Sequence, residues 1–283
     1  MITKDVKLIN QELDFPINTG RKTFKFLSQF RELWRFRELA IELFWTYLKL
    51  RYVGSVLGFI WTMLNPILYI VTYWIVFTCI VRMGLPDYPL YLIPGFLAWN
   101  FTFASLISAS ESILNSQYLI TKISFPIEIL TLASIAVNLF DFFVALILYL
   151  MAVVILPPTL PITALALPLV VMLQVLLTLG MALLAACVSV FFRDIPKLIP
   201  VLGTMVFFLT PIFYPLNIVP EPFQFLIKLN PMTHVITLYH DILYYRIWPD
   251  YLTLGSVFLI AIIFLIIGYW VFDRKRHTLA ELC

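Results

Sequence analysis

The stretch Leu50–Phe77, LRYVGSVLGFIWTMLNPILYIVTYWIVF, decides the fold class of this chain. It holds no charged residue after Arg51, and a helix needs about 20 apolar residues to cross a bilayer. Gly54 and Gly58 lie about one turn apart, and Asn65-Pro66 interrupts the middle. A proline inside a helix removes a backbone hydrogen bond and bends the axis. A simple anchor needs none of these features, so the stretch predicts a bent membrane helix that forms one wall of a passage.

The composition extends this prediction to the whole chain. Of the 283 residues, 62% are hydrophobic and 12% are charged, whereas soluble domains have about 45–50% and about 25%. The apolar residues form long runs rather than alternating strands, which favours helices over a membrane β-barrel. The sequence therefore predicts an all-α membrane protein. We expect six transmembrane helices, at 56–81, 90–107, 127–156, 162–192, 198–219 and 252–272.

The distribution of positive charge predicts the orientation. Lys and Arg accumulate on the cytoplasmic side of membrane proteins. With six spans, 16 of the 19 Lys and Arg residues lie on the side of the two termini, and only Arg82, Lys228 and Arg246 lie on the other. Both termini are therefore expected in the cytoplasm. The first residues lack the apolar region of a cleavable signal peptide.

The segments outside the spans have different patterns. Residues 1–29 are expected to form a cytoplasmic arm, and residues 276–283 a cytoplasmic tail. Residues 30–50 place charged side chains on one helical face and apolar ones opposite, which indicates an amphipathic helix in the membrane interface. The alternative is a cytosolic helix packed on another domain.

The segment between the fifth and sixth predicted spans, 215–250, is too apolar for a solvated loop and has too many prolines for one span. Two short helical runs, Pro222–Leu229 and Met232–Tyr245, flank Asn230-Pro231. Irregular backbone at membrane depth is tolerated only where protein or a water-filled cavity covers it. We expect a pair of half-inserted helices that gates the outer mouth, with Asn230, Pro231 and His234 at the gate. The alternative is a cap that only packs.

Aromatic residues recur at spacings of three and four in the outer half of the first span, and they gather again in the second and fifth. Aromatic faces stack on the apolar faces of sugar rings, so a row of them offers many weak contacts to a sliding sugar chain. Lipid contact or ordinary packing is the alternative for each ring. The residues expected to line the channel are Tyr69, Tyr73, Phe77, Phe101, Phe103, Phe207, Phe208 and Tyr214.

Asp141 is the only acidic residue deep within a predicted span, and Asn138 lies one turn earlier on the same face. A charge at the bilayer centre costs about 2.5–3.5 kcal/mol, so this carboxylate must face protein or water. Three roles are open for it: a structural polar contact, part of the wall of a pathway, or a proton-coupling group.

No motif supports an enzymatic activity. The sequence has no phosphate-binding loop, its three histidines lack zinc spacing, and its three cysteines show no metal or redox spacing. We therefore expect no catalytic residue, metal or cofactor on this chain. If transport is active, the energy must come from another chain.

Three motifs together resemble one family. RYVGSVLGFIWTMLNP (51–66), FFRDIPKLIP followed by LTPIFYP (191–215), and LNPMTHVI (229–236) resemble the ABC-2-type permeases that export polysaccharides such as O-antigen, capsule and teichoic acid. The motifs occur in the family's order, and the resemblance covers about residues 30–275. Val53 departs from the family, in which a basic residue is common at this place.

The resemblance implies a homodimer with two copies of a separate ATPase subunit, which would bind ATP and Mg²⁺. The path would lie at the dimer interface, between spans one, two and five. A short coupling helix within Glu111–Phe125 would receive motion from the ATPase, although this loop could also be a plain connector. Its candidate contact residues are Glu111, Asn115, Gln117, Tyr118 and Lys122.

The function implied by the resemblance is export of a lipid-linked polysaccharide such as O-antigen across the inner (plasma) membrane, as in lipopolysaccharide biosynthesis. The lipid-linked end would enter beside the interface helix, and the candidate access residues are Trp34, Arg37 and Arg51. Two alternatives stay open: an exporter of drugs or other small hydrophobic molecules, and a membrane scaffold for a cytoplasmic enzyme.

Overall fold

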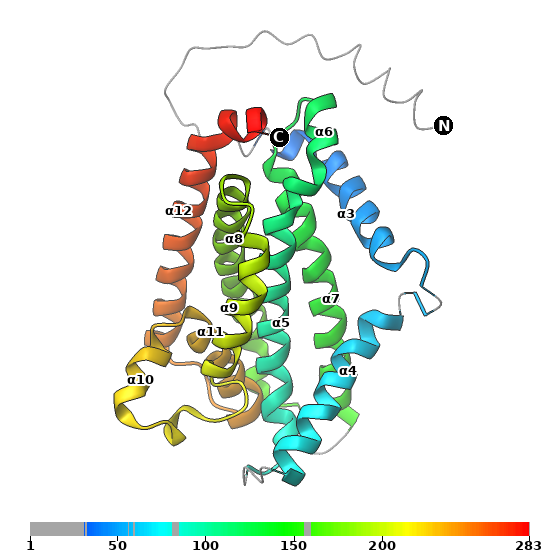
Figure 1. Cartoon of the computed structure of the whole chain (residues 1–283). Coiled ribbons are helices and arrows are strands. Elements are labelled where there is room, and N and C mark those ends of the chain that lie inside the picture. The colour runs from blue at the N-terminus through cyan, green and yellow to red at the C-terminus, as the bar shows by residue number, and fades with distance from the viewer. Residues whose placement is uncertain are drawn as a thin grey trace. The chain divides into compact units, whose positions relative to one another are not determined.

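The computed structural model describes residues 31, 33–55, 57–58, 60–80, 85–155 and 160–282. The predicted arm at 1–29 and Arg82 lie outside these residues. The chain divides between Arg35 and Phe36, and every helix labelled in Figure 1 belongs to the part that begins at Phe36. The described residues contain helices and connecting turns but no β-strand, which confirms the predicted all-α class.

The described chain consists of long helices with short helical elements between several of them (Figure 1). The long helices are α3 (Arg37–Tyr52), α4 (Ile60–Ile75), α5 (Tyr88–Ser112), α7 (Glu128–Ile155), α8 (Leu167–Phe191), α9 (Ile195–Leu209) and α12 (Tyr251–Leu282). The short helices are η1 (Val76–Ile80), η2 (Leu114–Ser116), α6 (Gln117–Lys122), η3 (Ile162–Ala166), η4 (Leu216–Ile218), α10 (Glu221–Lys228), α11 (Pro231–His240) and η5 (Asp241–Tyr245).

Four helical segments in the described part of the chain are long and apolar enough to cross a membrane: Tyr88–Ser112, Glu128–Val154, Ile162–Phe191 and Tyr251–Lys275. Two others are apolar but shorter, Met63–Tyr73 and Ile195–Leu209. They lie in the predicted first and fifth spans. The first continues through the π-helical turn η1, so its helical backbone runs without a break from Ile60 to Ile80.

The predicted fifth span, 198–219, is wrong at both ends. Helix α9 begins at Ile195 and ends at Leu209, where Thr210 adopts extended backbone with ψ of 139°. The residue before a proline is pushed out of the helical region by the proline ring, and Pro211 follows Thr210. The Tyr214 hydroxyl then donates hydrogen bonds to the carbonyls of Phe208 and Leu209 at 3.1 Å. These bonds satisfy carbonyls that the end of a helix leaves without an intrahelical partner.

Helices α8 and α12 are in backbone contact at two glycines. A Cβ atom on Gly180 would overlap the backbone of Phe264 and Leu265, and one on Gly268 would overlap the carbonyl oxygen of Gly180. Small residues allow such backbone contact between membrane helices, where packing replaces the hydrophobic effect as the main attraction. The two helices therefore form a tight pair.

A buried polar network joins α5, α8 and α11. The fully buried Gln174 of α8 donates from its amide nitrogen to the Ala98 carbonyl at 2.7 Å and to the Thr102 hydroxyl at 3.1 Å. Its amide oxygen accepts a hydrogen bond of 2.7 Å from the hydroxyl of Tyr239. Thr102 in turn lies 3.0 Å from the Thr178 hydroxyl. Because a buried amide without partners is costly, this network fixes how the three helices face one another.

Substituting Gly180→Ala should destabilise the α8–α12 pair, because the backbone of α12 must move away from the new methyl group. We expect a loss of about 1–3 kcal/mol in the free energy of unfolding, measured by thermal unfolding in detergent. Gly255→Ala is the matched control on α12, since nothing lies within 4 Å of its added Cβ. An equal loss in both variants would contradict the close contact.

Candidate functional site

Aromatic rings from α4, η1, α5, α9 and the turn after α9 meet in one cluster. Phe213 lies at its centre, with ring centroids 5.0 Å from Tyr73, 4.8 Å from Phe77 and 4.9 Å from Phe207. Aromatic pairs at such separations attract one another beyond their burial. We call this cluster the aromatic surface; it comprises Tyr69, Tyr73, Phe77, Phe96, Trp99, Phe103, Phe207, Phe208 and Phe213.

The aromatic surface has a buried layer and an exposed layer. Phe96, Phe207 and Phe213 are buried, whereas Tyr69 is 54% exposed and Phe208 is 57% exposed. The buried rings pack α4 and α9 onto α5 and so position the exposed rings. This arrangement leaves ring faces available to a partner or a passing molecule.

Phe103 joins the aromatic surface by stacking on Trp99, with centroids 5.5 Å apart. On its other side it lies against Gly203 of α9, where an added Cβ would overlap the ring. Phe101 does not join. It is buried against Phe142 of α7, with centroids 5.2 Å apart, because residues two positions apart lie on nearly opposite faces of a helix.

Two members of the aromatic surface, Phe96 and Trp99, were not among the predicted channel residues. Their signal was present in the sequence, since Phe96, Trp99 and Phe103 have the spacing i, i+3, i+7 of one helical face. The predicted Tyr214 lies beside the surface and donates to backbone carbonyls at the end of α9.

The predicted coupling loop contains the short helices η2 and α6, at the end of the structure where α12 also ends (Figure 1). Glu111, Asn115 and Tyr118 are exposed, and Gln117 is half-buried. The Lys122 ammonium lies 4.2 Å from the centre of the Tyr118 ring and donates to its hydroxyl at 2.5 Å. This loop thus presents an exposed, preorganised tyrosine.

Helix α3 packs on α7 and also contacts the predicted coupling loop. The Phe44 and Phe140 rings lie 6.1 Å apart, and the Tyr47 hydroxyl lies 3.2 Å from that of Ser116. Ile41 and Trp45 face outward and are about half exposed. The prediction of a helix at 30–50 is thus confirmed over Arg37–Tyr52, while its place in the membrane interface stays a prediction.

The predicted pair of short helices is confirmed as α10 and α11, at the opposite end from α6 (Figure 1). Asn230 joins this hairpin to α9: its side-chain oxygen accepts from the Met232 amide at 3.0 Å, and its nitrogen donates to the Thr210 hydroxyl at 2.8 Å. His234 bonds the Lys228 carbonyl at 2.8 Å. Pro231 occupies the first turn of α11, where its missing N–H costs nothing.

The hairpin holds two titratable groups whose pKa values are changed by burial. Burial lowers the pKa of His240 to about 3, so the imidazole is uncharged at neutral pH. Burial, together with the nearby Asp250, raises the pKa of Asp241 to about 6. Within the described residues, no group of three His, Cys, Asp or Glu side chains is placed to hold a metal ion.

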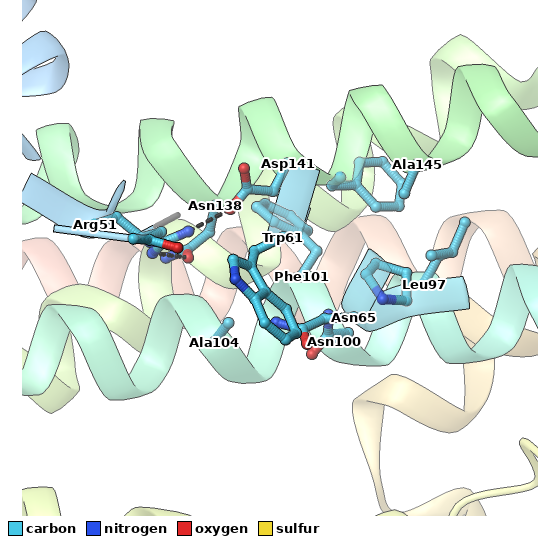
Figure 2. Close-up of a pocket in the computed structure, with 13 residues that line it drawn as sticks. Arg51, Trp61, Asn65, Leu97, Asn100, Phe101, Ala104, Asn138, Asp141 and Ala145 are labelled. Atoms are coloured by element: carbon cyan, nitrogen blue, oxygen red, sulfur yellow. Dashed lines mark hydrogen bonds and ion pairs between the residues drawn. The ribbon is translucent and has the colours of Figure 1, made fainter. Parts of the chain in front are cut away.

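Arg51 connects the end of α3 to the middle of α7 (Figure 2). Its guanidinium forms an ion pair with Asp141 and donates to the Asn138 side chain at 2.9 Å. Asn138 in turn donates to Ser108 of α5 at 2.7 Å. Three roles were open for Asp141, and the structure shows the first of them, a structural polar contact, in its ion pair with Arg51. The other predicted access residues, Trp34 and Arg37, are exposed.

The chain between α3 and α4 turns at the two glycines of the first motif. Gly54 has φ of 81° and Gly58 has φ of 45°, both in the left-handed region that other residues rarely adopt. These conformations let the chain leave α3 beside Arg51 and begin α4 at Ile60. The glycines thus serve a sharp turn in the chain.

The long apolar helices and the polar groups enclosed between them define an integral membrane protein. Residues 38–244 match the family described as ABC-2 type transporter. The chain belongs to this family, which confirms the resemblance seen in the three motifs.

Three relatives have named functions. The O-antigen export system permease protein RfbA of Myxococcus xanthus is 32% identical over 253 residues, which cover 89% of this chain and 97% of that protein. An O-antigen export system permease protein RfbA of Klebsiella pneumoniae is 27% identical, over 83% of this chain and 91% of that protein. The polysialic acid transport protein KpsM of Escherichia coli is 26% identical, over 77% of this chain and 85% of that protein.

The ion pair between Arg51 and Asp141 should show strong coupling in a double-mutant cycle. Arg51→Leu removes the charge that faces Asp141, so we expect a loss of about 1–2 kcal/mol in the free energy of unfolding for this partly exposed pair. The double variant Arg51→Leu/Asp141→Leu should lose less than the sum of the two single variants. Thermal unfolding measures the coupling, and purely additive effects would contradict it.

Proposed function

We propose that this chain is the membrane subunit of an ATP-driven exporter of a lipid-linked polysaccharide such as O-antigen. The relatives named for O-antigen export and polysialic acid transport support a saccharide cargo over a small hydrophobic drug. The exposed layer of the aromatic surface also favours transport over a scaffold role. The proposal places ATP hydrolysis, with ATP and Mg²⁺, on a separate partner subunit.

The observation that carries the proposal is the exposed layer of the aromatic surface. Tyr69 and Phe208 come from α4 and α9, which lie on either side of α5, and buried rings hold both in place. In a homodimer, this face and its copy would enclose a path between them. Ring faces attract the apolar faces of sugars without fixing one position, so a sugar chain can advance in small steps.

The two ends of the structure fit the two ends of such a path. Helix α6 would receive motion from the ATPase through Tyr118, which is exposed beside Lys122. At the opposite end, the α10–α11 hairpin would gate the outer mouth, because Asn230 links it directly to α9. This assignment puts α6 and both termini in the cytoplasm, as the Lys and Arg distribution predicts, and the proposed function places the protein in the inner membrane.

Replacing Tyr69 and Phe208 together with alanine should slow export several-fold, because the path loses two exposed ring faces. Stability should change little, since both side chains are more than half exposed. The measurement is the amount and chain length of polymer at the cell surface, with protein level followed in the membrane fraction. Phe258→Ala is the control, because this ring is similarly exposed but lies on α12. Export as fast as in the parent would exclude the path.

Tyr118→Ala should weaken the complex with the ATPase subunit by about tenfold or more, because exposed tyrosines contribute strongly to protein interfaces. The affinity can be measured by titrating purified ATPase onto the protein in lipid nanodiscs. Ser124→Ala, an exposed position just beyond α6, should leave the affinity unchanged. Undiminished binding of the Tyr118 variant would place the ATPase contact elsewhere.

A further inference from the structure

A cavity of about 450 Å³ lies between α4, α5 and α7, beneath the Arg51–Asp141 pair (Figure 2). This volume falls within the range of about 300–1,000 Å³ that is typical of small-molecule sites. Two features of the sequence make the space. Pro66 interrupts the hydrogen bonding of α4 beside the cavity, and the small side chains of Ala104 on α5 and Ala145 on α7 line it.

The cavity continues directly from the aromatic surface. On α4, Trp61 and Asn65 precede Tyr69 at intervals of four residues, so all three follow one side of the helix. On the antiparallel α5, Asn100 follows Phe96 at the same interval, and the rings of Phe96 and Tyr69 are 5.9 Å apart. One turn from this ring pair, toward α6, each helix therefore carries an asparagine in place of an aromatic residue: Asn65 on α4 and Asn100 on α5.

The two asparagines present exposed side-chain amides to the cavity. Among the residues that the structure describes, neither Asn65 nor Asn100 makes a side-chain hydrogen bond, and both line the cavity. An amide at membrane depth requires a polar partner. Both side chains are exposed, so water or an occupant with hydrogen-bonding groups can satisfy their amides, whereas a lipid tail in the cavity would leave them unsatisfied.

The charge of the cavity favours an uncharged occupant. Its one cation, Arg51, is already paired with its one anion, Asp141. A phosphate group would have to compete with this carboxylate for the guanidinium. A sugar ring meets no such competition, because its hydroxyls can bond to amides and carboxylates while its apolar face stacks on the Trp61 indole.

We infer that this cavity is a loading site for an uncharged sugar residue of the lipid-linked cargo, held by Asn65, Asn100 and Trp61 before it moves onto the aromatic surface. The inference rests on the proposed function and adds a step to it. Arg51 and Ser55, at the turn between α3 and α4, line the cavity, and we place its entrance beside them. The sugar therefore arrives on the side of α6 and leaves toward Tyr69.

The test compares two probes on the full-length protein with its ATPase partner in lipid nanodiscs. One probe is a polyprenyl diphosphate that carries a neutral disaccharide, and the other is the same polyprenyl diphosphate without sugar. Asn65→Ala and Asn100→Ala should each weaken binding of the sugar-bearing probe by about three- to tenfold, as expected for the loss of one or two hydrogen bonds. Binding of the sugar-free probe should not change.

Ala104→Leu tests the space itself, because the larger side chain fills the cavity without removing a polar group. It should lower the affinity for the sugar-bearing probe alone. Ala152→Leu is the matched control, since Ala152 is exposed on α7 and lies away from the cavity. Size-exclusion profiles of the complex show whether each variant folds. If Ala104→Leu does not fold, the two asparagine variants still decide the test.

Each outcome has a distinct meaning. An equal loss for both probes in the variants would assign the cavity to the diphosphate or lipid part of the cargo and overturn the inference. No loss for either probe would also overturn it. If the unsubstituted complex binds neither probe, the proposed function itself fails. The unsubstituted complex and all three cavity variants could show the same preference for the sugar-bearing probe over the sugar-free one. In that case the proposed function stands and only the inferred loading site is wrong.

Discussion

The fully buried amide of Gln174 determines how the helices around the candidate site face one another. Its nitrogen donates to α5 at two places, and its oxygen accepts from Tyr239 of α11. Because this amide has no alternative partner in an apolar interior, Ala98 and Thr102 must face α8. The rotation of α5 about its axis is then fixed. Phe96 and Trp99 consequently meet α4 and α9, and Phe101 meets α7.

The sequence was sufficient to predict most of the helices, because uncompensated backbone groups are excluded from lipid and apolar runs must become helices there. It also indicated the aromatic face of α4, where Tyr69, Tyr73 and Phe77 have helical spacing. It did not indicate that Phe101 packs on α7, since composition alone does not tell which face of α5 meets which neighbouring helix. It also overextended the fifth span, because residues after Pro211 remain apolar although the helix has ended.

Contacts between residues far apart in the chain lay beyond sequence reasoning. Arg51 and Asp141 are 90 positions apart in the sequence. The sequence placed Arg51 at the edge of the membrane and Asp141 within a span, and it gave no reason to pair them. Their pairing depends on α3 lying along α7, which no local pattern specifies. The same is true of the cavity, because Asn65 and Asn100 become neighbours only when α4 and α5 run antiparallel in one particular register.

The contact between Gly203 and Phe103 has a mechanical consequence. The Phe103 ring of α5 occupies the space that a Cβ at position 203 of α9 would need, so the two helices interlock at this point. We therefore expect the two helices to move together. Asn230 links the α10–α11 hairpin to Thr210 at the end of α9, so a displacement of α5 near α6 would be passed through this contact to the opposite end of the protein.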